Sequence, residues 1–240
     1  MSLLQVKNLV VEFPHRRGTL RAIDDISFDI APGEILGVVG ESGAGKSLTG
    51  AAIIGLLEPP GRVAGGHILL GGQRIDNLPS AQMRHIRGRQ IGAIFQDPLT
   101  SLNPLYTVGD QLTETIRAHL PVSADEARQR AIGLLQDTGI PAAAQRIGHY
   151  PHQFSGGMRQ RVVIALALAA EPKLIVADEP TTALDVSIQA QIITLLKSIC
   201  KERGAAVLLI THDMGVIAET CDRVAVLYAG RIAEIGPGPG

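Results

Sequence analysis

Short apolar runs alternate with longer segments of helical periodicity along this 240-residue chain. Runs rich in Val, Ile and Leu, bounded by glycine, proline and polar residues, predict strands. Two of them, 174–177 and 207–210, are apolar at every position, which is typical of strands covered by helices on both faces. The alternation predicts an α/β fold with a largely parallel central sheet. The expected strands are residues 4–11, 23–30, 35–39, 67–70, 91–95, 174–177, 206–210 and 223–228.

The helical pattern is clearest in four segments, which are residues 46–57, 124–138, 157–169 and 186–203. The second of these follows Ser123, and Glu126 stands three residues after that serine, which is the spacing of a capping box. Between Asp97 and Ser155 the strand signal disappears and helical periodicity takes over. We therefore expect a helical lobe inserted into the sheet domain.

The composition narrows the possible functions. The formal net charge is −1 and aromatic residues make up 3% of the chain, so neither a basic surface nor base-stacking platforms indicate a nucleic-acid partner. The two cysteines lie in no metal-ligand spacing, and a pair of reduced thiols is the simplest interpretation. The longest apolar run, 162–170, is too short to span a bilayer. We expect a soluble protein that would reach a membrane only through a partner.

A glycine-rich loop follows the expected strand 35–39 and opens the expected helix at Lys46. Its sequence fits the Walker A pattern, in which backbone N–H groups and a helix N-terminus bind phosphate. In such a loop the lysine reaches the β- and γ-phosphates, and the serine hydroxyl binds Mg²⁺. A chance glycine-rich turn is the alternative, and many unrelated families share this loop. The loop residues are Gly40, Glu41, Ser42, Gly43, Ala44, Gly45, Lys46 and Ser47.

Two acids end the apolar strand 174–177. Asp178 is placed to hold Mg²⁺ directly or through water, and Glu179 to polarise a water that attacks the γ-phosphate. A strand ending in two acids is by itself more often only a solvated strand end.

Gln96 and His212 also follow expected strands. In open α/β sheets ligands bind at the carboxyl edge, where such residues gather. Together with the phosphate loop, these residues predict a site for ATP and Mg²⁺.

The segment Phe154-Ser155-Gly156-Gly157-Met158 resembles the signature motif of ABC ATPases, usually written Leu-Ser-Gly-Gly-Gln. Other motifs of that family occur in family order across nearly the whole chain. They are the Walker A loop, the Q-loop at Gln96, the Walker B strand, Glu179, the D-loop ending at Asp185 and the switch His212. Phe154 and Met158 depart from the usual motif, while its Ser-Gly-Gly centre is kept.

The resemblance implies roles for these residues. Glu179, His212, Lys46 and Gln96 would serve catalysis, and Ser47, Gln96 and Asp178 would bind Mg²⁺. The Walker A loop and Asp185 would contact ATP, and Phe13 is the best candidate for the aromatic that stacks on adenine, although a core Phe is the alternative. Ser155, Gly156 and Gly157 would cap the γ-phosphate held by the opposite subunit. The resemblance thus implies a head-to-tail, ATP-dependent dimer, either a homodimer or a pair with a paralogous subunit.

The family also implies a fold and a division of the chain. We expect a P-loop NTPase, or RecA-like, core with an antiparallel β subdomain, formed by residues 1–96 and 156–240. The helical signature subdomain would be residues 97–155. The last five residues, 236–240, alternate Gly and Pro and predict a flexible tail.

Before the signature, Tyr150-Pro151-His152-Gln153 resembles importers, and runs at 96–104, 177–186, 211–216 and 228–231 resemble the peptide, nickel and glutathione branch. This implies an ATPase that drives uptake of peptides, or of nickel or glutathione. Its partners would be two transmembrane permeases and an extracytoplasmic solute-binding protein, and it would lie peripherally on the cytoplasmic face of the inner membrane. A soluble ABC ATPase outside transport, or a nucleotide-binding module without turnover, are the other readings.

Overall fold

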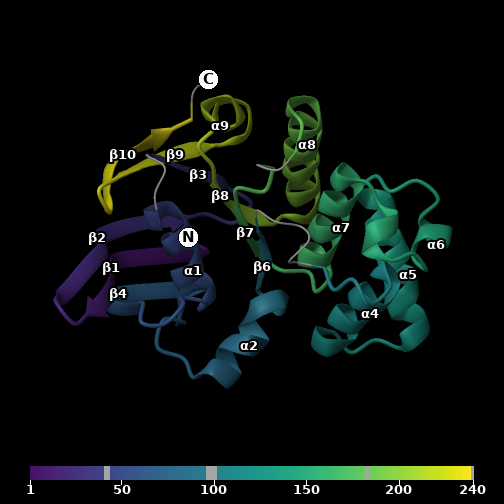
Figure 1. Cartoon of the computed structure of the whole chain (residues 1–240), viewed down its shortest axis with the longest axis horizontal. Helices are drawn as coiled ribbons and strands as arrows, with labels where there is room; N and C mark the ends of the chain where they lie inside the picture. Colours follow the sequence, from purple (N-terminus) through teal and green to yellow (C-terminus); the bar gives the residue numbers. More distant parts are fainter. Residues whose placement is uncertain (41–43, 96–101, 182–183, 239–240) are drawn as a thin grey trace. The chain divides into compact units, whose positions relative to one another are not determined.

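The computed structural model describes residues 1–40, 44–95, 102–181 and 184–238. The chain forms two compact units, one comprising Met1–Arg84 with Ala206–Gly240 and the other His85–Ala205 (Figure 1). The chain passes from the first unit to the second within helix α2 (Ser80–Arg89). Both units combine strands with helices, so the predicted α/β class is confirmed.

An antiparallel sheet forms part of the first unit, with strands in the order β2 (Gly18–Ile30), β1 (Leu4–His15), β4 (Arg62–Leu70) and β5 (Gln73–Arg74). β1 lies between β2 and β4, and Leu4 pairs with Ile30 on one side and Leu70 on the other. Alternate apolar side chains of β1, such as Leu4 and Val6, are buried. This is the expected antiparallel β subdomain. β1 and β2 extend beyond the expected ranges because they continue to pair with each other as far as the turn between His15 and Gly18.

The first unit also contains β3 (Ile35–Gly40), β8 (Ala206–Ile210) and β9 (Arg223–Tyr228), with β3 between the other two and parallel to both. β10 (Arg231–Pro237) pairs antiparallel with β9. The helices of this unit are α1 (Ala44–Ile54) and α9 (Met214–Thr220).

β10 differs from the sequence-based expectation. It continues through Gly236 and Pro237, two residues into the segment expected to fray, because these residues pair with Val224 and Arg223 of β9. The N–H of Gly238 then donates to the Asp222 carbonyl at 2.9 Å. Backbone hydrogen bonds fix residues 236–238, and such bonds leave no pattern of side chains in the sequence.

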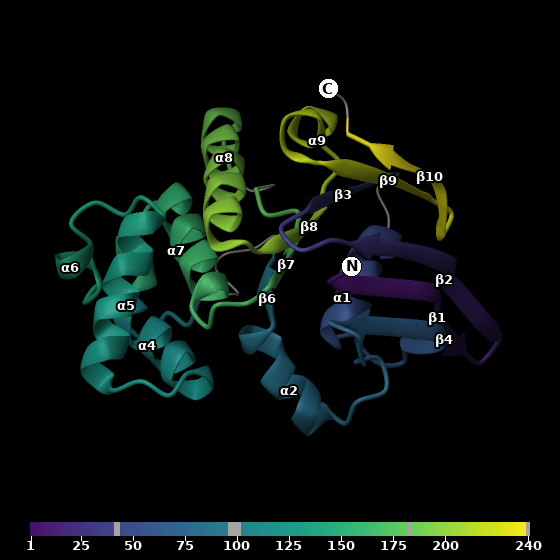
Figure 2. The same ribbon diagram turned by 180° about the vertical axis from the view of Figure 1, so that it is seen from behind.

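The second unit pairs β6 (Ile91–Ile94) in parallel with β7 (Leu174–Asp178). Its helices are α4 (Val108–His119), α5 (Ala124–Asp137), α6 (Ala143–Arg146), α7 (Gly156–Leu168) and α8 (Val186–Arg203), with a 3₁₀ turn η1 at Pro151–Gln153. Figure 2 shows α4, α5, α6 and α7 gathered together, and α8 lies beside α7.

Helix ends in both units follow local chemistry. Ser123 caps α5 as predicted, since its hydroxyl accepts from the N–H of Glu126 at 3.2 Å. α1 was expected to reach residue 57 but ends at Ile54, because Gly55 adopts a left-handed conformation with φ 72°. Within the described residues, no helix is both long and apolar enough to cross a membrane.

Candidate functional site

The phosphate loop joins β3 to α1 in the first unit. Gly40 closes β3 with φ 153°, and a Cβ there would lie 2.0 Å from the carbonyl oxygen of Leu227, so only glycine fits. Lys46 is 5% exposed, and its Nζ donates to the Gly40 carbonyl at 3.3 Å. Ser47 is exposed in the first turn of α1. Glu41, Ser42 and Gly43 lie outside the described residues, whereas α1 begins at Ala44 and continues through Gly45.

His212 follows β8 and is exposed. Val38 of β3 pairs with Ile210 of β8. Gly40 and His212 each lie two residues beyond this pair along the chain, so they are at the same level. The segments that contain Gly40 and His212 therefore leave the sheet at the same carboxyl edge, as predicted. The N–H of Thr211 donates to the Val38 carbonyl at 3.2 Å, which fixes the start of this segment. Beyond it, Asp213 caps α9 by accepting from the N–H groups of Gly215 and Val216.

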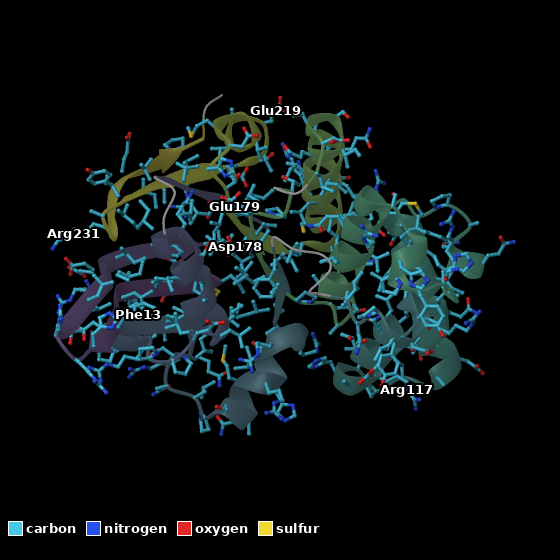
Figure 3. The ribbon with its side chains drawn as sticks, viewed as in Figure 1. Phe13, Arg117, Asp178, Glu179, Glu219 and Arg231 are labelled. Atoms are coloured by element: carbon cyan, nitrogen blue, oxygen red, sulfur yellow. The ribbon has the colours of Figure 1, made fainter. Side chains whose placement is uncertain are left out.

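Phe13 lies near the end of β1 and is half-buried (Figure 3). Its ring packs against Gly61, where a Cβ would lie only 2.7 Å from Phe13 Cε1. Across the strand pair, Phe13 faces Leu20, which is 57% exposed. The ring is therefore supported by backbone and still partly open to solvent, a setting suited to stacking on a planar base.

Two acids end β7 in the second unit, and both are half-buried (Figure 3). Glu179 has φ 48°, a left-handed conformation that costs a non-glycine residue on the order of 1–3 kcal/mol and occurs preferentially at functional sites. Ala177 of β7 pairs with Ile94, the last residue of β6. The first residue after β6 therefore lies level with Asp178. Gln96, which the sequence assigns to this position, lies outside the described residues.

The signature segment begins α7 in the same unit. Ser155 is the N-cap and is exposed, and its hydroxyl accepts from the N–H of Met158 at 3.3 Å. A Cβ on Gly157 would lie 3.0 Å from Cγ2 of Ile188, so the first turn of α7 packs closely against the first turn of α8. Asp185 stands at the N-cap position of α8, where it is exposed and its side chain makes no capping bond. The signature and the D-loop thus lie side by side.

Phe154 replaces the usual signature leucine without disturbing the motif. Its side chain is 3% exposed and points away from the helix start, toward the ring of His149 and the guanidinium of Arg146. Its carbonyl accepts from Arg159 Nη1 at 2.9 Å. Phe154 is therefore a core residue, and Ser155 is the exposed residue of the motif, beside half-buried Gly156 and Gly157.

Two residues near these motifs were not predicted from the sequence. Gln160 in α7 is 1% exposed and hydrogen-bonds the carbonyl of Pro180, next to Glu179. Gly61 supports Phe13. In the sequence Gln160 stands between Arg159 and Arg161, so no local signal marks it as a buried residue. By contrast, burial raises the pKa of the Cys200 thiol to about 12, so this cysteine is a protonated core residue.

Comparison with known proteins agrees with these motifs. A family model described as ABC transporter matches residues 23–182. The oligopeptide transport ATP-binding protein OppD of Bacillus subtilis is 52% identical over 235 residues, which cover 98% of this chain and 66% of that protein. The dipeptide transport ATP-binding protein DppD of Escherichia coli is 49% identical over 236 residues, covering 98% and 72%.

Solved structures with the same fold include two ATP-binding cassettes. The dimeric, post-hydrolysis structure of MJ0796 bound to ADP and Pi superposes with a TM-score of 0.85 at 30% identity and covers 99% of each chain. CbiO1 of Clostridium perfringens, part of the ABC transporter complex CbiONQ, superposes with a TM-score of 0.82 at 30% identity and covers 98% of this chain and 88% of its own. The chain thus shares sequence and fold with ATP-binding cassettes over nearly all of its length.

Proposed function

Because the chain belongs to the ABC transporter family, we propose that it is the ATP-hydrolysing subunit of an importer that takes up peptides. The observation that carries the proposal is the identity of about one half to OppD and DppD over 98% of the chain. The chain spans 66% of the first of these relatives and 72% of the second. Nickel or glutathione is the alternative cargo, on the resemblance of the local motifs to that branch.

We assign ATP hydrolysis to residues from both units. Lys46 lies in the phosphate loop and would bind the β- and γ-phosphates, and Phe13 would stack on adenine. Glu179 would accept a proton from water as the water oxygen bonds to the γ-phosphorus. The bond between that phosphorus and the β–γ bridging oxygen breaks, and its electron pair leaves with ADP. His212, exposed after β8, would hold the attacking water and the γ-phosphate in line. Gln96 would contact the water and the ion.

The oxygen donors of the chain fit a magnesium ion bound with the nucleotide. The Ser47 hydroxyl is exposed in the first turn of α1, and Asp178 is a half-buried carboxylate at a strand end. Within the described residues no cluster of three His, Cys, Asp or Glu side chains could hold a metal. Two oxygen donors would suffice for Mg²⁺, which takes one or two protein ligands and completes its shell with phosphates and water. When bound, Mg²⁺ neutralises charge on the phosphates.

Dimerisation follows from the signature. Exposed Ser155 and half-buried Gly156 and Gly157 form a helix N-terminus, which favours binding of an anion. We propose that this helix start, with Asp185 beside it, contacts ATP bound by a second ATPase subunit. The partner would be a copy of this chain or a paralogue. The structural relative MJ0796 is described as dimeric, which supports such an arrangement.

The transporter would also need two permeases and an extracytoplasmic solute-binding protein, with this subunit on the cytoplasmic face of the membrane. A candidate permease contact is the loop before α4, where Leu105 is 79% and Tyr106 54% exposed. The side chain of Gln111 holds this loop, since its Nε2 donates to the carbonyls of Asn103 at 2.8 Å and Tyr106 at 3.0 Å. Exposed apolar side chains on such an ordered loop are typical of a protein–protein contact.

The cargo is tested by deleting the gene in the organism that encodes the chain and measuring uptake of labelled dipeptides, tripeptides, nickel and glutathione. Peptide uptake should fall and be restored by the wild-type gene but not by Lys46→Ala. Loss of nickel or glutathione uptake alone would establish the alternative cargo. Unchanged uptake of all four would contradict the importer assignment.

A further inference from the structure

Gln160 is a polar side chain in the core of the second unit. It lies on the buried face of α7, is 1% exposed, and is followed by the buried residues Val162 and Val163. Its Nε2 donates a hydrogen bond to the carbonyl oxygen of Pro180, twenty positions further along the chain. Its Oε1 is buried and has no hydrogen-bond partner among the described residues. The amide orientation follows from this bond, since the reversed amide would place two acceptors against each other.

The side chain of Gln160 donates its hydrogen bond to the backbone beside the proposed catalytic residue. Pro180 directly follows Glu179, which has φ 48°. A non-glycine residue holds this conformation only where its surroundings impose it. Pro180 has no N–H, so its carbonyl is the one backbone hydrogen-bonding group that this residue offers. A donor on that carbonyl fixes the peptide plane between Pro180 and Thr181, directly after the residue that follows Glu179, and so restrains the backbone segment that holds Glu179.

Stability does not account for a glutamine at this position. A buried amide oxygen without a hydrogen-bond partner loses its solvation, which offsets the gain from the bond that the amide makes. An unbranched apolar side chain of similar length would fill the same space with no unpaired atom. The hydrogen bond to Pro180, and not burial alone, therefore accounts for a glutamine at position 160.

We infer that Gln160 is a positioning residue that sets Glu179 for proton abstraction and ties it to the signature helix. The helix α7 starts at Gly156, and Gln160 lies one turn later on the same rigid element. A shift of α7 when its N-terminus meets the partner's nucleotide would therefore be transmitted to the chain's own Glu179. This inference rests on the proposed function, in which Glu179 is the general base.

The test replaces Gln160 by methionine, which keeps length and burial but cannot donate to Pro180. We expect kcat for ATP hydrolysis to fall by roughly 10- to 100-fold, as for a misplaced catalytic group, with KM within about twofold. The Tm should change by less than about 5 °C, a small shift for a chain of this size. Gln136→Met makes the same chemical change on the exposed side of α5 and should leave all three values unchanged.

A double-mutant cycle separates positioning from a structural role. If Gln160 acts through Glu179, adding Gln160→Met to Glu179→Gln should slow radiolabelled phosphate release by less than about twofold. A full, additive loss, or a Tm lowered by more than about 5 °C, would overturn the inference. So would wild-type kcat in Gln160→Met while Glu179→Gln is inactive. If wild-type protein itself released no phosphate, the proposed function would fail instead.

Discussion

At the scale of single residues, the adenine contact is the most open to a direct test. Phe13 packs edge-on against Gly61, so its position depends on the absence of a side chain there. A methyl group at Gly61 would come within 2.7 Å of Cε1 and displace the ring. Each base stacked on an aromatic ring contributes on the order of 1–3 kcal/mol.

We therefore expect Gly61→Ala to weaken ATP binding by roughly fivefold, a part of that stacking energy. Inorganic tripolyphosphate has no base, so its affinity should not change. Titration calorimetry with both ligands checks this, and Phe13→Ala serves as the reference for complete loss of the ring. Equal weakening of both ligands would mean that the substitution disturbs the phosphate loop and that Phe13 does not carry the base contact.

The motif residues could be predicted because their chemistry is local. Ser155 and Ser123 cap helices through bonds to residues three positions away, and such bonds are encoded in short stretches of sequence. Gln160 could not be assigned in this way. Its role depends on Pro180, which the fold and not the sequence brings beside it, and on burial that a single glutamine does not reveal.

Among the structural elements, the loop before α4 is the segment that we propose to contact the permease. Tyr106 is 54% exposed on this loop, and Tyr228 is 57% exposed on β9, which makes the second tyrosine a matched control. We expect Tyr106→Ala to reduce peptide uptake by roughly tenfold or more, since large aromatic residues dominate protein interfaces. ATP affinity should stay unchanged because Tyr106 lies in none of the nucleotide motifs.

Tyr228→Ala should leave uptake as it is. Cells that express each variant at equal levels provide the comparison, with ATP affinity measured on the purified proteins. If both tyrosine variants transport normally, the loop before α4 is not a major permease contact.

Strands with a buried face were predictable, whereas others were not. β8 was predicted at its observed bounds because all five of its residues are apolar and buried. β10 was missed because most of its side chains are exposed, and its pairing with β9 rests on backbone bonds. The end of α1 was misplaced because Gly55, and not the apolar pattern of the following leucines, stops the helix.

At the scale of the whole molecule, the chain is expected to act as half of a dimer. Ser155 is exposed and the signature glycines are half-buried at a helix start, and we expect a second subunit to bring nucleotide to them. Glu179→Gln should bind ATP but not hydrolyse it, so the closed state should accumulate. Size-exclusion chromatography should show a monomer without nucleotide and a dimer with ATP and Mg²⁺.

Lys46→Ala is the control for that experiment, because without its phosphate contact it should remain monomeric under both conditions. If Glu179→Gln stays monomeric with ATP bound, the chain does not pair with itself. The paralogue would then be the required partner, and addition of that subunit should restore the dimer.

We propose that this chain hydrolyses ATP and that Glu179 activates the attacking water. The most direct measurement is the rate of phosphate release from ATP by the purified wild-type protein beside Glu179→Gln, at saturating ATP and Mg²⁺. We expect steady turnover by the wild type and a rate about 10²–10⁴-fold lower for the variant, the range that a positioned general base contributes. Equal rates, or no turnover by the wild type, would contradict this proposal.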